Sequence, residues 1–300
     1  MKNLLLSGGT GFIGSKLVNH LLEAFSDLSI HILVRDKKAT KSQPRIHYWE
    51  WNPENGEIAS EIPKNIDTII HLAGANIAEK RWTSKRKKVL LESRTKSSAL
   101  LVDWVISNDV PVQRFISASA IGWYGEANGA RPFEEQDPAG NDFLAQVCEA
   151  WEAAAHPLIE HGIRTVFIRT GLVLSPEGGM WKEMKKAFAF RVAPRFGNGK
   201  QVFSWITLHD LLRLYTFAAV TDGIHGPINA VAPHPVSQLT LIKALLKKQS
   251  NISITLPIPA SMLKVGLGEL SQELLKNAPV SAEKAIGYGF NFLQPNISDI

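Results

Sequence analysis

Glycines near the amino terminus have the spacing of a turn that holds a diphosphate. Residues 2–14, KNLLLSGGTGFIG, join an apolar strand to Gly9, Gly11 and Gly14, which fit the pattern G-x-G-x-x-G. Such glycines permit a tight turn, a close approach of the backbone to the phosphates and close packing of a helix on a sheet. A helical pattern over residues 15–25 follows, and the N-terminus of a helix attracts anions.

A glycine turn without a ligand would have the same sequence, but the flanking strand and helix favour a dinucleotide site. The residues expected to form it are Gly8, Thr10, Gly11, Phe12, Ile13 and Gly14.

The second apolar strand, residues 29–34, is followed by side chains that would meet the adenosine ribose. Asp36 would accept hydrogen bonds from the ribose hydroxyls of NAD, whereas Arg35 would pair with the 2′-phosphate of NADP. Because Lys37 and Lys38 come next, the local charge is positive and NADP is favoured. A solvated basic turn is the alternative for the two lysines.

Three segments carry a resemblance to a known family. SGGTGFIG also fits G-x-x-G-x-x-G and resembles the opening of the extended short-chain dehydrogenase/reductase family. Residues 68–75 resemble the family's HLAG-type turn, which implies that Leu72, Ala73 and Gly74 approach the cofactor. Residues 114–125, RFISASAIGWYG, resemble the family's strand with a serine run and a Tyr-Gly, which places Ser119 at the catalytic serine. A small residue that ends a buried strand is the alternative for Ser119.

The family's Tyr-x-x-x-Lys pair is absent from the sequence. With Glu152 taken as the family's helix glutamate, Leu144 stands at the tyrosine and Cys148 at the lysine. Leucine has no proton to give and a thiol carries no positive charge, so another group would have to donate the proton. The candidates are, in order, Tyr124, Asp142, Cys148 and Glu149. A packed aromatic side chain is the alternative for Tyr124.

The resemblance extends to one branch of this family, the atypical epimerase branch with its own C-terminal domain. The segments that carry it are residues 51–53, 81–82, 143–152, 204–206, 209–210, 229–235 and 287–295. Membership implies that the chain binds NADP, but it implies no particular substrate. Trp51 is expected just after the third strand, where it would lie against the adenine or be buried.

The remaining elements predict the fold that positions these residues. Apolar strands alternate with helical patterns, which is typical of a parallel sheet covered by helices on both faces. The expected strands are residues 2–7, 29–34, 45–49, 68–72, 114–117 and 165–169, and the later helices are 180–190, 210–219, 237–249 and 263–275. We therefore expect an α/β fold with a Rossmann-type doubly wound sheet. Residues 1–175 would form the NADP-binding domain, residues 205–231 would return to it, and residues 176–204 and 232–300 would form a smaller C-terminal substrate-binding lobe.

Composition excludes several other classes. Cys148 is the single cysteine of 300 residues, so no internal disulfide and no thiolate metal cluster can form, and we expect no metal site. This usage suits the reducing cytoplasm, where we expect the protein. The apolar run at the amino terminus breaks at Gly8, too early for a secretory core or a membrane span.

The basic segment at residues 80–88 is interpreted as the solvated start of a helix capped by Thr83 or Ser84. No nucleic-acid-binding motif accompanies it, so nucleic acid is not an expected partner.

Two function classes follow from these observations. The first is an NADP-dependent oxidoreductase or epimerase that acts on an unknown small polar or nucleotide-linked substrate, as a monomer or homodimer. The second is an NADP-binding sensor or scaffold without turnover. The retained Ser119 and a second lobe suited to closing a pocket favour the enzyme.

Overall fold

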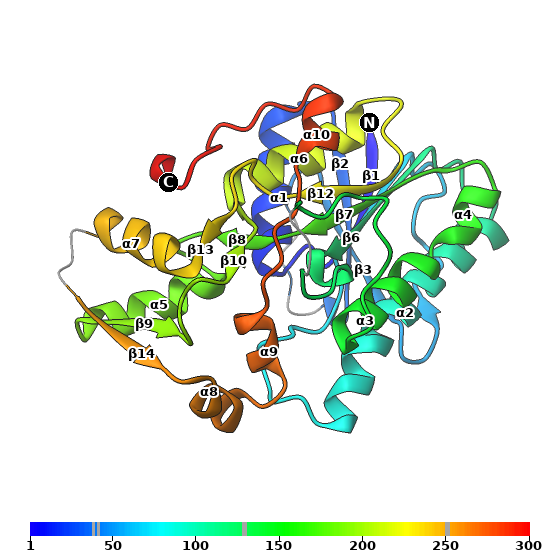
Figure 1. Cartoon of the computed structure of the whole chain (residues 1–300). Helices are drawn as coiled ribbons and strands as arrows, with labels where there is room; N and C mark the ends of the chain where they lie inside the picture. Colours follow the sequence, from blue (N-terminus) through cyan, green and yellow to red (C-terminus); the bar gives the residue numbers. More distant parts are fainter. Residues whose placement is uncertain (38–39, 41–42, 128–130, 250–252) are drawn as a thin grey trace.

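The apolar strands of the first half assemble into one sheet. The computed structural model describes residues 1–37, 40, 43–127, 131–249 and 253–300, so Lys38 lies outside the described residues. The central sheet has eight strands in the order β12-β7-β6-β5-β1-β2-β3-β4 (Figure 1), and all neighbouring pairs are parallel except β3 and β4. The strands are β1 Asn3–Ser7, β2 Ser29–Val34, β3 Ile46–Asn52, β4 Glu57–Ile58, β5 Thr68–His71, β6 Arg114–Ala120, β7 Arg164–Thr170 and β12 Gly226–Ala230. This architecture confirms the predicted Rossmann-type α/β fold.

Helices cover both faces of the sheet because successive side chains of each strand point to opposite faces. On β1, Leu4 and Leu6 pack with helices α1 (Phe12–Ala24) and α6 (Leu208–Val220), and Leu5 packs on the other face with α2 (Ser84–Ser107) and α4 (His156–Glu160). Helix α3 (Phe143–Ala153) lies beside α2 and contacts β6. All three leucines are fully buried. The carboxyl end of β1, which leads into the glycine turn, is therefore held by packing on both faces of the sheet.

Two helices differ from the sequence prediction by more than two residues. Helix α1 begins at Phe12 rather than at residue 15, since Gly14 belongs to the helix although it adds nothing to an apolar pattern. The helix expected over residues 263–275 is instead two helices, α8 (Ala260–Leu267) and α9 (Leu270–Leu275). Gly268 separates them with φ +63°, a left-handed conformation that ends a helix.

The second half of the chain forms a lobe beside the sheet (Figure 1). Its elements are β8 Leu172–Leu174, α5 Gly179–Ala189, β9 Val192–Phe196, β10 Val202–Phe203, β11 Trp205–Thr207, β13 Val236–Ser237, α7 Gln238–Lys248, β14 Ile254–Ile258, α8 and α9. Between β11 and β13 the chain runs through α6 and then through β12, which pairs with β7 at the edge of the large sheet. The short helices η2 (Ile121–Trp123), α10 (Glu283–Gly287) and η3 (Ile297–Asp299) complete the described elements.

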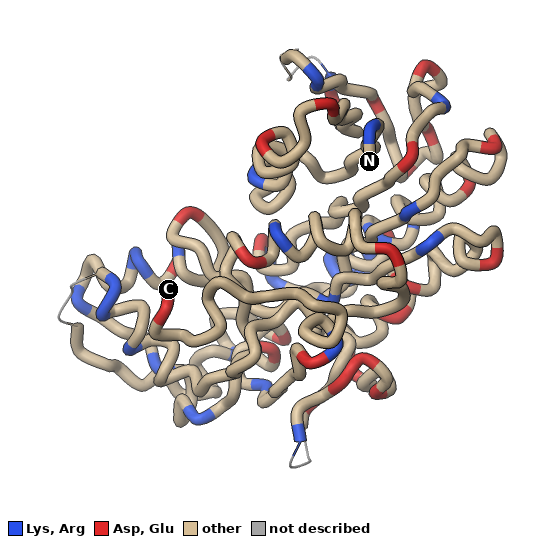
Figure 2. Tube along the Cα trace, turned by 90° about the horizontal axis from the view of Figure 1, so that it is seen from above, with Lys and Arg blue, Asp and Glu red and all other residues tan. Residues whose placement is uncertain are grey.

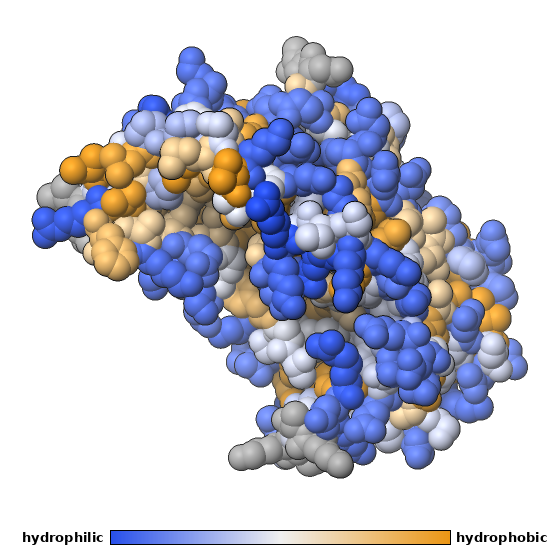
Figure 3. Space-filling view, turned by 90° about the horizontal axis from the view of Figure 1, so that it is seen from below, coloured by the Kyte–Doolittle hydropathy of each residue, from blue (hydrophilic) through white to orange (hydrophobic). Residues whose placement is uncertain are grey.

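Figure 3 shows several hydrophobic residues, among hydrophilic ones, on one surface of the lobe. Exposed apolar side chains come from β14 and α8, with Ile254 70%, Met262 64% and Val265 76% exposed. Among the described helices, none is both long and apolar enough to cross a membrane.

Candidate functional site

The glycine turn after β1 lies directly against the turn after β5. Gly8 has φ +72°, and a Cβ built on it would lie 2.8 Å from the carbonyl carbon of Leu72. The amide of Leu72 donates to the Ser7 carbonyl at 3.1 Å, which continues the parallel ladder into the turn. Only glycine at position 8 permits this approach. The structure therefore brings together the glycine turn and the Leu72–Ala73–Gly74 segment, which the sequence analysis assigned to one cofactor.

The first turn of α1 follows the glycine turn without a side-chain cap. Gly11 is the N-cap residue and its amide donates to the Gly8 carbonyl at 3.0 Å. Since no cap side chain accepts from the amides of Phe12 and Ile13, these N–H groups are available to an anion. A Cβ on Gly14 would lie 2.2 Å from the Gly8 oxygen, so this helix can approach the turn only with glycine there. The cradle fits a diphosphate.

Side chains beside the glycine turn connect it to the lobe. The ring of Phe12 lies against Gly178 at the start of α5, where a Cβ would be 2.4 Å from the ring. Ile13 packs against the core beneath the sheet, and Thr10 is exposed. Lys16 of α1 pairs with Glu177 beside this contact. The glycine turn is thus joined to the first helix of the lobe.

A buried histidine supports both turns from below. His71 Nδ1 lies 2.6 Å from Ser7 Oγ, and its Nε2 lies 3.2 Å from Ser97 Oγ. The Ser97 hydroxyl donates to the Ser93 carbonyl at 2.7 Å, so it accepts from His71, which assigns a neutral ring protonated at Nε2. Burial lowers the pKa of His71 to about 3, with a smaller contribution from the Arg94 charge. Ser7 Oγ in turn accepts from the Ala73 amide at 3.3 Å.

The ribose end of the predicted site lies at the same edge of the sheet, because β2 pairs with β1 in parallel. Arg35 is exposed, and no carboxylate of the described residues lies within 4.0 Å of its guanidinium. The neighbouring Lys37 lies over the Trp49 ring at 5.3 Å. The positive charge of Arg35 is therefore available to a ligand.

Trp51 is placed differently from the expectation. It lies inside β3 rather than after it, because β4 pairs with the end of that strand and extends it. Its side chain is 6% exposed and packs in the core beside Leu33. It also lines a hollow of about 450 Å³ together with Arg35 and Glu50. This position favours the buried alternative, and contact with an adenine stays a prediction.

Ser119 lies in a buried polar network on β6. Its hydroxyl donates to Glu152 Oε1 at 2.6 Å, and its side chain is 4% exposed. Glu152 forms a two-bond ion pair with Arg169, whose Nε and Nη2 each lie 2.9 Å from a carboxylate oxygen. The Ser119 proton is thus engaged, whereas its lone pairs are free to accept a hydrogen bond.

Tyr124 belongs to the same network. Its hydroxyl donates to Asn229 Oδ1 at 2.7 Å and accepts from Arg169 Nη1 at 3.1 Å, and its ring stacks on Phe133. Burial raises the pKa of Tyr124 to about 12, although the Arg169 charge opposes this shift. A phenol so placed is a poor proton donor at neutral pH, so the geometry favours the packed alternative.

The other acid candidates have different surroundings. Burial and the Glu152 charge raise the pKa of Cys148 to about 12. Asp142 caps α3 by accepting from the Ala145 amide, and it pairs with Lys276 of the lobe at 2.7 Å. Glu149 is exposed on α3. Leu144 and Cys148 both face η2, since a Cβ on Gly122 would contact each of them.

Sequence reasoning missed two arginines of this region. Arg169 lies in the buried part of β7, directly after the apolar residues 166–168, and a charged residue within a buried strand is a signal that a partner is needed. Arg94 of α2 extends to the turn after β5, where a Cβ on Gly74 would lie 3.2 Å from its guanidinium carbon. The apolar periodicity of α2 says nothing about that contact.

The basic segment at residues 80–88 leads into α2, which begins at Ser84 with Thr83 as its cap. Arg86 pairs with Glu79, and Lys87 pairs with Glu269. Figure 2 shows that basic and acidic residues are interleaved along the trace.

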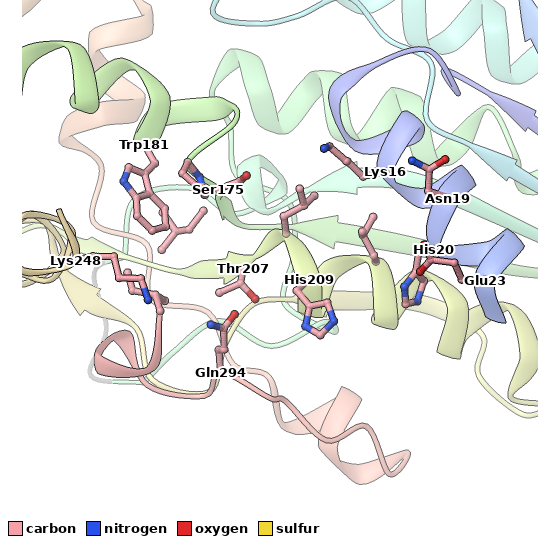
Figure 4. A pocket seen from close by; sticks show the side chains of 15 residues that line it. Lys16, Asn19, His20, Glu23, Ser175, Trp181, Thr207, His209, Lys248 and Gln294 are labelled. Atoms are coloured by element: carbon pink, nitrogen blue, oxygen red, sulfur yellow. The ribbon is translucent and has the colours of Figure 1, made fainter.

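A second hollow, of about 510 Å³, lies between α1, the start of α6 and the lobe (Figure 4). Lys16, His20 and Glu23 of α1 and His209 of α6 line it, but no residue of the glycine turn does.

Comparisons with known proteins agree with this geometry. The sequence model of the NAD dependent epimerase/dehydratase family matches residues 4–231. An epimerase family protein of Mycobacterium bovis is 35% identical over 298 residues, which cover 98% of this chain and 94% of that protein. The chain belongs to the NAD-dependent epimerase/dehydratase family. The predicted membership of an epimerase branch is thereby confirmed.

Solved structures of epimerase family proteins extend the comparison. The crystal structure of human epimerase family protein SDR39U1 (isoform 2) with NADPH has a TM-score of 0.85 and 28% identity, covering 99% of this chain and 97% of that one. The nucleoside-diphosphate sugar epimerase from Corynebacterium glutamicum has a TM-score of 0.77 and 30% identity, covering 99% of this chain and 56% of that one. The epimerase fold therefore spans the whole chain, including the lobe.

Proposed function

We propose that this protein is an NADP-dependent oxidoreductase or epimerase that acts on a small polar or nucleotide-linked substrate. The observation that carries the proposal is the cradle formed by Gly8, Gly11 and Gly14. Its backbone is closed against Leu72 and Ala73, and its helix amides have no side-chain cap. The human relative that was crystallised with NADPH supports the same cofactor class.

Arg35 supports the choice of NADP over NAD. Its planar guanidinium matches the geometry of a phosphate, and it lies on the strand next to the cradle without a carboxylate partner among the described residues. Hydrogen bonds between charged groups contribute enough free energy to give about a tenfold preference.

When bound, the nicotinamide supplies hydride transfer, and the chain must orient it and hold the substrate. Ser119 is the proposed contact for a substrate oxygen. Because its proton is directed at Glu152, it would accept a hydrogen bond from a substrate hydroxyl. The lobe would close the pocket, since Lys276 joins α9 to the start of α3, where the family's tyrosine would stand.

Titration of the purified protein with NADPH and NADH, followed by fluorescence, tests the cofactor assignment. We expect NADPH to bind at least about tenfold more tightly, and Arg35→Ala to make the two affinities equal. Lys37→Ala is the matched control, since Lys37 is a neighbouring exposed cation that lies over Trp49. Equal binding of both cofactors by the intact protein would contradict the assignment.

A metabolite screen that follows NADPH absorbance for net redox turnover, and the NMR spectrum of the substrate for epimerisation without net redox change, separates the enzyme from a sensor or scaffold. Ser119→Ala should lower the rate of any substrate found. Ser117→Ala is the control, because Ser117 is a buried serine of the same strand whose hydroxyl bonds to a backbone carbonyl. Unchanged turnover in Ser119→Ala would remove Ser119 from the reacting groups.

A further inference from the structure

The guanidinium of Arg94 lies between the turn after β5 and helix α3, beside the proposed cofactor site. Its Nη2 donates to the Ala75 carbonyl at 3.1 Å, and its Nη1 donates to the Leu90 carbonyl at 2.9 Å. The guanidinium carbon lies 5.0 Å from the centre of the Trp151 ring, and the Gly74 backbone lies on another side. The group is therefore held in place before any ligand arrives.

The charge of Arg94 is not balanced within the described part of the chain. Within the described residues its guanidinium donates only to neutral carbonyls, and no carboxylate of these residues lies within 4.0 Å. Arg86, on the same helix, differs because it pairs with Glu79 at 3.0 Å. Burial lowers the pKa of Arg94, which shows the cost of keeping this cation away from water. Arg94 is partly buried, and a cation withdrawn from water without a counter-charge is destabilising unless an anion or a set of oxygen acceptors joins it.

Arg94 lies near the place where the family's lysine would put a positive charge. Cys148 occupies the place of the family's lysine, and Trp151 is one helical turn further along α3. Arg94 from α2 packs on Trp151, and its charge acts on the Cys148 thiol. Gly74, which touches the guanidinium, belongs to the turn that closes on the glycine cradle. A cation thus reaches this region from α2 rather than from α3.

We propose that Arg94 is a binding residue for the diphosphoribose part of the dinucleotide, and that it supplies from α2 the positive charge that α3 lacks. This inference rests on the proposed binding of NADP(H). Oxygen atoms of a diphosphate or a ribose suit the remaining N–H donors of the fork. The contact would not involve the adenosine 2′-phosphate, which is assigned to Arg35 at the end of β2.

Three ligands that share the adenosine 2′-phosphate test the assignment: NADPH, 2′-phosphoadenosine diphosphoribose, and adenosine 2′-phosphate, which has no part of the diphosphoribose. Calorimetry on Arg94→Gln should show about tenfold weaker binding of the first two and unchanged binding of the third. Arg86→Gln is the matched control, because Arg86 also donates to a carbonyl of the segment between β5 and α2, that of Asn76, but has Glu79 as a partner. It should bind all three ligands as the unmodified protein does.

Other outcomes overturn the inference. Equal weakening of all three ligands would make Arg94 a structural residue, and unchanged binding of NADPH would remove it from the site. Loss for NADPH alone would move the contact to the nicotinamide. If the unmodified protein binds none of the three, the proposed function fails along with this inference, whereas normal binding by both Arg94→Gln and the unmodified protein refutes the inference alone. If Arg94→Gln does not fold, Arg94→Lys tests the same pattern of three ligands.

Discussion

His71 should make the protein less stable in mild acid. It is the buried histidine between Ser7 and Ser97, beneath the two turns of the cofactor site. Its ring is neutral in the folded state because burial lowers its pKa from 6.5 to about 3. In the unfolded chain the same ring titrates near its ordinary value. Between these two values the unfolded state binds more protons, so the stability contributed by the neutral ring is complete above about pH 6.5 and is lost as the pH falls toward 3.

The size of this effect follows from the two pKa values. At about pH 5, protonated His71 rings outnumber neutral ones about thirtyfold in the unfolded chain, whereas the ring in the folded protein is not protonated. The unfolded state is therefore favoured by about 2 kcal/mol relative to about pH 7.5. His31 adds a similar dependence, since burial lowers its pKa to about 4. A variant is needed to isolate the share of His71.

Urea unfolding of the unmodified protein and of His71→Asn between about pH 5 and pH 7.5 measures that share. Asparagine loses part of the hydrogen bonding at every pH, so only the pH dependence is compared. We expect the free energy of unfolding of the variant to fall by about 2 kcal/mol less across this range. His161→Asn, at an exposed position, is the control. The same pH dependence in the unmodified protein and in His71→Asn would refute the neutral buried ring.

Two further substitutions have consequences that can be measured. Gly14→Ala should abolish NADPH binding, because its Cβ would lie 2.2 Å from the Gly8 oxygen. Ser15→Ala, at the exposed neighbouring position, is the control and should leave binding unchanged. If calorimetry shows that Gly14→Ala binds NADPH with the affinity of the unmodified protein, the result would count against the cradle. Arg169→Met should cost about 3–5 kcal/mol in urea unfolding, since it leaves the buried Glu152 carboxylate without its ion-pair partner. A loss below about 1 kcal/mol there would mean that the pair contributes little.

Much of the fold could be predicted from local patterns in the sequence. The strands around the glycine turn could be predicted because they are short apolar runs that end in turn residues. The start of α1 and the division of the helix at residues 263–275 could not, because both depend on the backbone conformation of glycines, which add nothing to an apolar pattern. Gly14 packs on the backbone of Gly8, and Gly268, with φ +63°, lies against Arg81, which precedes α2.

The geometry of the cofactor cradle could be predicted from the sequence, whereas the surroundings of the acid candidates could not. Gly8, Gly11 and Gly14 are neighbours in the chain, so their spacing carries the geometry. The environment of Tyr124 depends on Asn229, more than a hundred residues away, and no periodicity predicts that hydrogen bond. The surroundings of Arg94 likewise come from separate elements, the β5 turn and α3.

The most direct test of the account is calorimetric titration of the folded, unmodified protein with NADPH and with NADH. We predict one site per chain, with heat released on addition of NADPH and an affinity for NADH that is at least about tenfold lower. Absence of heat with both dinucleotides would contradict the assignment of residues 8–14 as a diphosphate cradle, and with it the proposed function.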